Sequence, residues 1–417
     1  MEPLLRDGVV VVGAGQAGGR AVEAMRGAGF TGPITLVGEE AEPPYERPAL
    51  SKDMLLGSDE IAWVRPADWY AQHGIALRLD TRVAAIDRAA RSLRLEDGDA
   101  LPYGALLLAT GGRPRPLPAP GGDHPRCHPI RRLADTRALR PHLHPGAHLV
   151  VVGGGFIGLE AASAARAKGA QVTLVEAGGA LMARCVPAEV GAFYAALHAG
   201  KGVDLRFNTQ VARIEDDAGT PSIVLDTGER IRADAVVVGI GIVPNAELAA
   251  GAGLRVANGI VVDAFGRTED PLIWAAGDVA SRYDPRYGRH LRLESWQNAQ
   301  NAAIAVARNI VGKPAPHSEV PWFWTDQHGL NMQIAGLVSD TLPWIARGTP
   351  GEGPALRLQM DGSRPVAAIG INAARDLRFI KELMLLGAEV SPQLLADPTA
   401  KLADLVRSAK RDLRPAA

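Results

Sequence analysis

Gly13, Gly15 and Gly18 follow an apolar run at residues 9–12 and precede an Ala-rich segment. In a G-x-G-x-x-G turn, the first glycine turns the chain tightly, the second admits a pyrophosphate, and the third lets helix and strand pack closely. The phosphates then lie at the positive N-terminal end of the helix. Glu39 ends the next apolar run, where it is placed to accept a hydrogen bond from a ribose hydroxyl. This pattern predicts a dinucleotide-binding unit, and an ordinary tight turn is the alternative.

The same pattern occurs a second time, with Gly153, Gly155 and Gly158 followed by Glu176 at the end of the next apolar run. Two complete fingerprints predict two dinucleotides, one a flavin adenine dinucleotide and the other a nicotinamide cofactor. An acid at Glu176 favours NADH, because it bonds a free 2′-hydroxyl and repels a 2′-phosphate. No arginine directly follows Glu176 to receive that phosphate, and Arg184 is the nearest downstream cation.

Each fingerprint lies within a repeat of apolar strand, glycine turn, Ala-rich helix and second apolar strand. Near-continuous valine runs suit parallel strands that are buried on both faces, and strand–helix–strand alternation predicts doubly wound α/β units. Further apolar strands end in glycine-containing turns at residues 106–112, 235–245 and 272–280. After Pro314 this pattern stops and three tryptophans occur close together. We therefore expect an α/β fold with two Rossmann-like domains and a C-terminal α+β domain.

Composition excludes several classes of protein. The 417 residues carry 45 basic and 46 acidic side chains, so bulk binding to nucleic acid or acidic lipid is not expected. Two cysteines, Cys127 and Cys185, cannot form a disulfide framework, a four-cysteine zinc site or an iron–sulfur cluster. No metal site is expected. The apolar run near the N-terminus is too short for a signal peptide, and no stretch reaches the ~18 apolar residues of a membrane helix. These features predict a cytoplasmic protein.

Several longer motifs resemble those of the FAD-dependent ferredoxin reductases of bacterial oxygenase systems, within the glutathione-reductase superfamily. The resemblance covers nearly the whole chain and keeps the order of the motifs. The matching segments are PYERPALSK (44–52), ATGG (109–112), GGRPRPLP (111–118), GGGFIGLEAA (153–162), VGIGIVPN (238–245), AAGDV (275–279), ESWQNAQN (294–301) and PWFWTDQ (321–327).

This resemblance implies an FAD-binding domain in two segments (1–113 and 241–319), an NAD-binding domain (114–240) and a C-terminal domain (320–417). Asp278 resembles the residue that bonds the ribityl chain of FAD, and Trp296 lies in a segment like the one that lines the isoalloxazine. Beyond the glycine turns, the implied cofactor contacts are Ala17, Glu39, Arg47, Lys52, Val83, Ala109, Thr110, Gly111, Arg131, Ile157, Glu160, Glu176, Arg184, Gly239, Gly277, Asp278, Glu294, Trp296 and Trp324.

Lys52 and Glu160 resemble a family pair near the flavin and the nicotinamide, and we predict that they are catalytic. In this hypothesis Lys52 stabilises the reduced, anionic flavin near N5, while Glu160 holds Lys52 and borders the nicotinamide. A purely structural salt bridge is the alternative. The cofactors carry the hydride chemistry, so the protein mainly stacks and orients them.

Disulfide-using relatives pass electrons from the flavin to a closely spaced cysteine pair. This chain has no such pair, so we expect electrons to leave from the flavin to a separate [2Fe–2S] ferredoxin that supplies an oxygenase or a cytochrome P450. Trp322 and Trp324 line the exit or pack the C-terminal domain. Basic residues at helical spacing are a candidate ferredoxin-docking surface: Arg407, Lys410, Arg411 and Arg414.

Two other functions stay open at this point. One is an NADH oxidase or peroxidase, although these normally use a redox cysteine near the flavin and residues 43–52 contain none. The other is a flavoprotein like apoptosis-inducing factor, which would favour a basic surface over the net charge of −1 found here.

Overall fold

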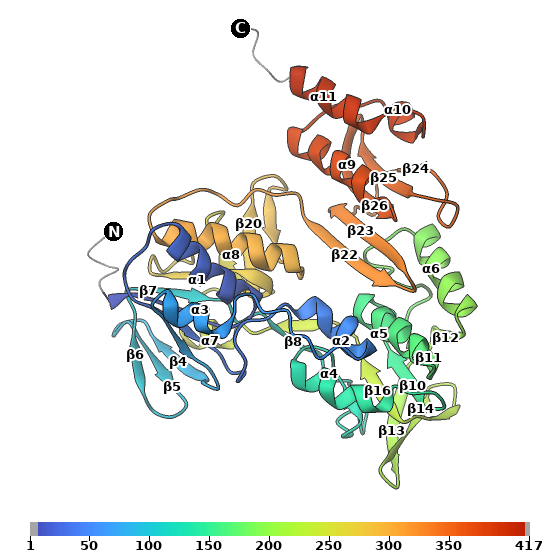
Figure 1. Cartoon of the computed structure of the whole chain (residues 1–417), viewed down its shortest axis with the longest axis horizontal. Helices are drawn as coiled ribbons and strands as arrows, with labels where there is room; N and C mark the ends of the chain where they lie inside the picture. Colours follow the sequence, from blue (N-terminus) through green and yellow to red (C-terminus); the bar gives the residue numbers. More distant parts are fainter. Residues whose placement is uncertain (1–6, 413–417) are drawn as a thin grey trace. The chain divides into compact units, whose positions relative to one another are not determined.

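The computed structural model of the protein describes residues 7–412. These residues form two compact units, each assembled from segments that are distant in the sequence (Figure 1). The first unit holds the chain up to residue 49, residues 60–113 and residues 242–318; the second holds residues 50–59, 114–241 and 319 onward. No helix in the described part of the chain is long and apolar enough to cross a membrane. The division into four domain segments stays a prediction.

The first unit is built on a five-stranded parallel sheet, whose strand order is β19-β7-β1-β2-β3. All four valines of β1 are buried, as expected for a strand in the middle of such a sheet. The strands are β1 (Val9–Val12), β2 (Ile34–Val37), β3 (Ile75–Arg78), β7 (Ala105–Leu108) and β19 (Ile273–Ala275).

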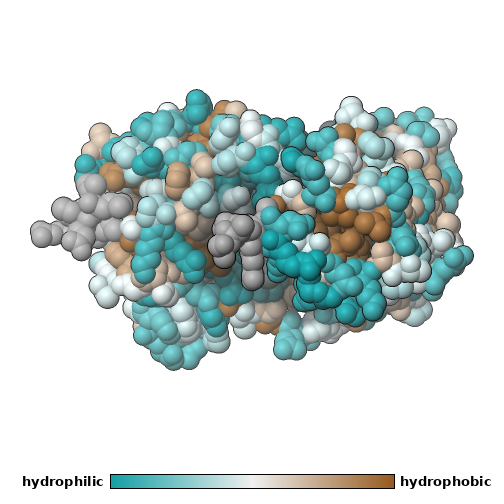
Figure 2. Space-filling view, turned by 90° about the horizontal axis from the view of Figure 1, so that it is seen from above, coloured by the Kyte–Doolittle hydropathy of each residue, from teal (hydrophilic) through white to brown (hydrophobic). Residues whose placement is uncertain are grey.

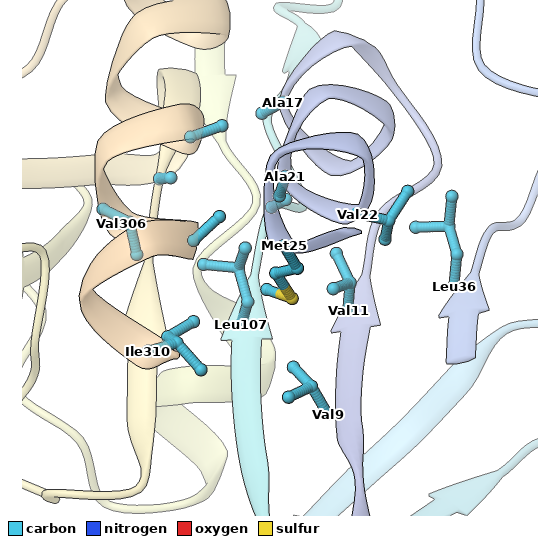
Figure 3. Packing of buried hydrophobic residues seen from close by; sticks show 14 of the residues in the cluster. Val9, Val11, Ala17, Ala21, Val22, Met25, Leu36, Leu107, Val306 and Ile310 are labelled. Atoms are coloured by element: carbon cyan, nitrogen blue, oxygen red, sulfur yellow. The ribbon is translucent and has the colours of Figure 1, made fainter. Parts of the chain in front are cut away.

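Two helices, α1 (Gln16–Gly27) and α8 (Trp296–Ile310), cover one face of this sheet (Figure 3). Val9 and Val11 of β1 point toward Met25 of α1, and α8 packs beside them through Val306 and Ile310. Because successive strand residues point to opposite faces, Val10 and Val12 belong to a second core on the other side. Both faces are therefore buried, and the valine runs correctly predicted buried parallel strands.

The second core is closed by an antiparallel sheet with the order β4-β5-β6 and by helix α7 (Glu247–Gly251). The remaining elements of the first unit are α3 (Ala67–Gln72), β4 (Val83–Asp87), β5 (Ser92–Leu95), β6 (Ala100–Pro102), β8 (Gly112–Pro114), β17 (Ile242–Pro244), β18 (Ile260–Val262), β20 (Ala280–Asp284) and β21 (Arg289–Leu291). Strand β8 ends at the boundary between the units.

The second unit repeats the same plan, with a parallel sheet in the order β12-β11-β10-β16-β9. Its strands are β9 (Cys127–His128), β10 (His148–Val152), β11 (Gln171–Glu176), β12 (Val203–Phe207) and β16 (Ala235–Val238). Its helices are α2 (Asp53–Leu56), α4 (Leu133–Leu139), α5 (Phe156–Ala167) and α6 (Ala188–Gly200), and β13 (Val211–Asp217), β14 (Thr220–Leu225) and β15 (Arg230–Arg232) form an antiparallel sheet.

The C-terminal part of the second unit is a five-stranded antiparallel sheet with the order β22-β23-β26-β25-β24. Three helices follow it, and α9 and α11 pack together over an apolar core. The elements are β22 (Trp322–Gln327), β23 (Leu330–Gly336), β24 (Trp344–Arg347), β25 (Ala355–Asp361), β26 (Arg364–Ile371), α9 (Ala374–Leu386), α10 (Pro392–Ala396) and α11 (Leu402–Asp412). The predicted fold class, two Rossmann-like parts and a C-terminal α+β part, is confirmed.

Polar residues cover most of the face seen in Figure 2, and hydrophobic residues gather there in a few patches. Few large hydrophobic side chains are exposed among the described residues, and two of them, Leu385 and Leu394, are 45% exposed in the C-terminal helices α9 and α10.

Candidate functional site

The first glycine turn, between β1 and α1, uses its three glycines in three ways. Gly13 has a φ of +111°, and a Cβ there would lie 2.2 Å from the Ala109 carbonyl oxygen. A Cβ on Gly18 would lie 1.9 Å from the Gly13 carbonyl oxygen. A Cβ on Gly15, by contrast, would come no nearer than 3.7 Å to any atom, which is Nη2 of Arg47. The protein's own packing therefore requires the outer two glycines, while Gly15 leaves the backbone open to a ligand such as a pyrophosphate.

Arg47 brings a positive charge to this turn. Its Nη2 donates to Glu40 Oε1 at 2.6 Å and its Nη1 to the Tyr45 hydroxyl at 3.1 Å. Burial alone would lower the pKa of the Arg47 guanidinium, but Tyr45 and Glu40 beside it raise the pKa above its ordinary value. The charge is thus permanent and held in place, and it suits an anionic diphosphate at Gly15.

Most predicted FAD contacts in the first unit lie just after its parallel strands, at the carboxyl ends where open α/β sheets bind ligands. A Cβ on Gly277 would lie 3.0 Å from the Cβ of Ala17, so the turn after β19 meets the start of α1. Ser295 caps α8 by accepting from the Asn298 amide at 3.2 Å, which fixes Trp296 as the first helical residue. The residues after strands or at the start of α8 are Glu39, Ala109, Thr110, Gly111, Gly277, Asp278, Glu294 and Trp296, whereas Val83 begins β4.

A pair of hydrogen bonds fixes the turn after β7. The Thr110 hydroxyl donates to the backbone carbonyl of Asn245 at 2.7 Å. The side-chain amide of Asn245 donates to the backbone carbonyl of Thr110 at 2.9 Å. The motif ending in Asn245 therefore holds the segment that carries Thr110 and Gly111.

The second glycine turn, between β10 and α5, repeats the arrangement of the first. Gly153 has a φ of +105°, and a Cβ there would lie 2.6 Å from the Gly239 carbonyl oxygen. A Cβ on Gly158 would lie 2.1 Å from the Gly153 carbonyl oxygen. For Gly155 the nearest atom would be Gly239 O at 3.8 Å, so this backbone too is open to a ligand. Ile157 lies in the first turn of α5 and is 41% exposed.

Glu176 ends β11 with its carboxylate turned back to the glycine turn. Its Oε2 accepts from the Gly154 amide at 2.6 Å, and its Oε1 accepts from the Gly178 amide at 2.7 Å. The two backbone bonds fix the carboxylate, and its remaining lone pairs can accept from ribose hydroxyls. Arg184 is exposed in the segment between β11 and α6.

Lys52 and Glu160, the predicted catalytic pair, are in contact inside the second unit. Lys52 Nζ lies 2.8 Å from Glu160 Oε2. The Glu160 side chain is 3% exposed and lies on α5 one turn after Phe156, while Lys52 directly precedes α2 and is 19% exposed. The structure places the two side chains in contact, and their catalytic role stays a prediction. Arg131 and Trp324 belong to this same unit.

Two hydroxyls that sequence reasoning did not single out complete the surroundings of Glu160. Ser51 Oγ donates to Oε2 at 2.5 Å and Thr325 Oγ1 donates to Oε1 at 2.7 Å. The carboxylate thus receives two hydroxyl bonds and an ammonium, which is how a buried charge is tolerated. Ser51 belongs to the PYERPALSK motif and Thr325 to the PWFWTDQ motif, but no spacing rule links either one to Glu160.

Trp322 and Trp324 lie on β22 with their rings stacked, 5.1 Å between centroids and 20° between planes. Lys52 Nζ lies 5.9 Å from the centroid of Trp324, and Lys381 Nζ lies 6.0 Å from that of Trp322. The stack therefore connects the Lys52 neighbourhood to helix α9. Whether electrons leave along it stays a prediction.

Both cysteines are half-buried, and burial, helped by Asp123, raises the pKa of the Cys127 thiol to about 11.

Arg407, Lys410 and Arg411 are exposed on α11, where Arg407 pairs with Asp404 and Lys410 lies 2.5 Å from Glu382. Arg414 lies outside the described residues, and docking by this cluster stays a prediction. Over residues 7–412, no three potential metal-ligating His, Cys, Asp or Glu side chains are grouped.

Comparison with known proteins decides the family. The profile described as pyridine nucleotide-disulphide oxidoreductase matches residues 7–303, and the one described as reductase C-terminal matches residues 322–406. The chain belongs to the pyridine nucleotide-disulphide oxidoreductase family. The matched residues, 7–303, include both glycine turns.

Within this family, the chain is similar to reductases of nearly the same length. The ferredoxin–NAD⁺ reductase component of the anthranilate 1,2-dioxygenase system of Burkholderia cepacia is 46% identical, over 95% of this chain and 98% of its own. Rhodocoxin reductase of Rhodococcus erythropolis is 40% identical, over 93% of this chain and 92% of its own. In the solved covalent putidaredoxin reductase–putidaredoxin complex, a chain with 37% identity covers 96% of this chain and 98% of its own with a TM-score of 0.93. The predicted likeness to ferredoxin reductases of oxygenase systems is confirmed.

Proposed function

We propose that this protein is an FAD-dependent NADH:ferredoxin reductase that supplies an oxygenase or a cytochrome P450. The observation that carries the proposal is the presence of two open glycine turns, at Gly15 and Gly155, in a chain that matches such reductases over 93% to 95% of its length. FAD, when bound, would accept two electrons from NADH and pass them one at a time to a [2Fe–2S] ferredoxin.

Each cofactor has its own holding residues. Gly15 and Arg47 would hold the diphosphate of FAD in the first unit, one by an open backbone and the other by charge. Gly155 would admit the diphosphate of NADH in the second unit, and Glu176 would accept from its adenosine ribose. A fixed carboxylate at that position repels a 2′-phosphate, so NADH is preferred over NADPH.

Lys52 and Glu160 supply the charged groups at the reaction centre in this proposal. The Lys52 ammonium would stabilise the negative charge of the reduced flavin near N5. Glu160 holds Lys52 by the 2.8 Å contact, and it would border the nicotinamide. Because preorganised charges act without reorganising during the reaction, a fixed ammonium lowers the barrier to flavin reduction.

Electrons leave without help from a cysteine pair. The chain has two cysteines, and burial keeps the Cys127 thiol protonated at neutral pH because its pKa is raised to about 11. A thiol in that state is a poor electron relay, since the thiolate is the reactive form. A separate ferredoxin therefore takes the electrons, and we place the reaction in the cytoplasm, where NADH and reduced thiols prevail.

The test is an anaerobic titration of the purified yellow protein, first with NADH and separately with NADPH, followed by mixing with a [2Fe–2S] ferredoxin. We expect NADH to bleach the flavin readily and NADPH to do so poorly. The bleached protein should then reduce two molecules of ferredoxin for each NADH consumed. A protein that does not bind FAD, or a reduced protein that passes electrons only to oxygen, would contradict the proposal.

A further inference from the structure

A chain of hydrogen bonds runs from the Glu160 carboxylate to two histidines that the proposed reaction does not use. Thr325 on β22 donates to Glu160 Oε1 at 2.7 Å, and Gln327 Nε2 donates to Thr325 Oγ1 at 3.1 Å. Gln327 Oε1 then lies 2.9 Å from His198 Nε2 on α6. The chain ends where His328 Nε2 lies 3.1 Å from His198 Nδ1. All of these residues lie within the second unit.

The donors fix the direction of every bond in the chain. Thr325 has one hydroxyl hydrogen, which it gives to Glu160, so it must accept from the Gln327 amide. The Gln327 carbonyl oxygen can only accept, which assigns the hydrogen to Nε2 of His198. His198 Nδ1 is then the accepting nitrogen and His328 donates to it. All four bonds therefore point toward the one carboxylate.

Burial and charge agree with this assignment. Thr325 and His198 are 0% exposed and Gln327 is 1% exposed, so water does not compete for these groups. Burial lowers the pKa of His198, and burial together with His198, Lys201 and Arg166 lowers the pKa of His328 to about 4. Both imidazoles are neutral at neutral pH, which gives His198 the one donor and one acceptor that the chain requires.

The alternation of β22 and the turns of α5 explain why these groups meet. Residues 323, 325 and 327 share one face of the strand, and Phe323 packs on Phe156 with 4.4 Å between ring centroids. Glu160 lies one helical turn beyond Phe156, so it faces Thr325. One face of β22 therefore packs along one face of α5, and the Glu160 carboxylate lies between them.

We propose that Thr325, Gln327 and His198 are positioning residues for the Glu160–Lys52 pair, holding Oε1 from one side so that Oε2 stays turned to Lys52 and Ser51. The inference rests on the proposed function, in which this pair acts when NADH reduces the flavin. It assigns to β22 a part in the reductive step that is distinct from any part in electron exit.

A second contact joins α6 to the C-terminal sheet. Arg357 on β25 donates twice to Glu189 on α6, at 2.5 and 3.1 Å. This ion pair does not include Glu160. It provides a matched control, because Glu189→Gln weakens the same junction without touching the carboxylate.

The experiment compares Thr325→Val, which keeps the shape and removes the donor, with Thr325→Ser, which keeps the donor. Stopped-flow mixing of the FAD-loaded variants with NADH gives a limiting rate of flavin reduction and a dissociation constant for NADH. We expect Thr325→Val to lower the limiting rate about tenfold, as for the loss of a hydrogen bond to a charged group, with the dissociation constant unchanged. Thr325→Ser and Glu189→Gln should reduce the flavin at nearly the parent rate.

Gln327→Met serves as a second variant if Thr325→Val does not fold, and we expect a smaller fall in its limiting rate because Thr325 still donates. Glu160→Gln separates this inference from the proposed function. A slow Glu160→Gln with a fast Thr325→Val would overturn the positioning role and leave the function standing. A Glu160→Gln protein that is as fast as the parent would overturn both the role of the pair and the inference. If Thr325→Val, Thr325→Ser and Glu189→Gln all lowered the limiting rate equally, the hydrogen-bond chain would have a structural role only, and the positioning role would be overturned.

Discussion

In the second glycine turn, between β10 and α5, replacing Gly155 should weaken NADH binding, whereas replacing Gly158 should lower the stability of the fold. A methyl group on Gly155 meets no atom closer than 3.8 Å, and the φ of −83° and ψ of 179° suit alanine. Gly155→Ala should therefore change the free energy of unfolding by less than about 1 kcal/mol. It places the methyl group where the diphosphate must approach, so NADH should bind at least about tenfold more weakly, or about 1.4 kcal/mol.

Gly158→Ala is the matched control, since the same methyl group would lie 2.1 Å from the Gly153 carbonyl oxygen. No side chain can relax to relieve that contact, because its partner is backbone. Helix α5 must shift away from the turn, and overpacking of this kind costs about 1–3 kcal/mol or more. Urea unfolding of the two variants gives the stability difference.

The binding arm mixes each FAD-loaded variant with increasing concentrations of NADH in an anaerobic stopped-flow instrument. The dissociation constant for NADH comes from the concentration dependence of the rate of flavin reduction. A Gly155→Ala protein that binds NADH as tightly as the parent would refute the view that this backbone faces the diphosphate. A Gly158→Ala protein with unchanged stability would refute the packing argument for the third glycine. Gly15→Ala should give the corresponding result in the first unit, with weakened retention of FAD.

Four further predictions follow from the other groups. Glu176→Ala should raise the KM for NADH about tenfold and that for NADPH much less, because the ribose loses a charged acceptor; steady-state kinetics with both nucleotides checks this. Lys52→Met should slow flavin reduction and destabilise the protein by leaving Glu160 buried and unpaired, whereas adding Glu160→Gln should restore stability in urea unfolding but not the rate. Because the pKa of His328 is lowered from 6.5 to about 4, the unfolded chain binds more protons between these values. The free energy of unfolding should fall as pH is lowered through that window, and His328→Asn should flatten the slope in urea unfolding at pH 7 and 5. Charge reversal on α11 should raise the ferredoxin KM at low salt and much less at high salt if the cluster docks the partner; the residues to change to glutamate are Arg407, Lys410 and Arg411.

The glycine turns could be read from the sequence because they are made by neighbouring residues. Gly13 and Gly153 both adopt a positive φ, and each lies between a buried strand and a helix, as its local pattern predicts. The acid at the end of the next strand belongs to the same short unit, so the spacing along the chain is enough to predict Glu176. Such features depend on local sterics and on strand–helix alternation, and both are written in short stretches of sequence.

The surroundings of Glu160 could not be predicted in this way. Ser51 and Thr325 lie 109 and 165 positions from Glu160 along the chain, and only the folded second unit brings them together. Gln327 and His198 are likewise 129 positions apart. A hydroxyl or an amide in a strand has no periodic signature that distinguishes a solvent-facing group from one that contacts a carboxylate. The family resemblance pointed to Lys52 and Glu160, but not to the groups that hold them.

The energetics of Glu160 favour a chemical reason for its presence. A carboxylate that is 3% exposed loses most of its hydration, and replacing a buried ion pair with apolar residues of similar volume is often neutral or stabilising. Stability alone therefore does not explain an arrangement in which two hydroxyls, an ammonium and a chain of buried polar groups all serve one carboxylate. What the arrangement does provide is an ammonium whose position is fixed from several sides before NADH binds. In the proposed function, this fixed charge would meet the negative charge of the reduced flavin without waiting for side chains to move.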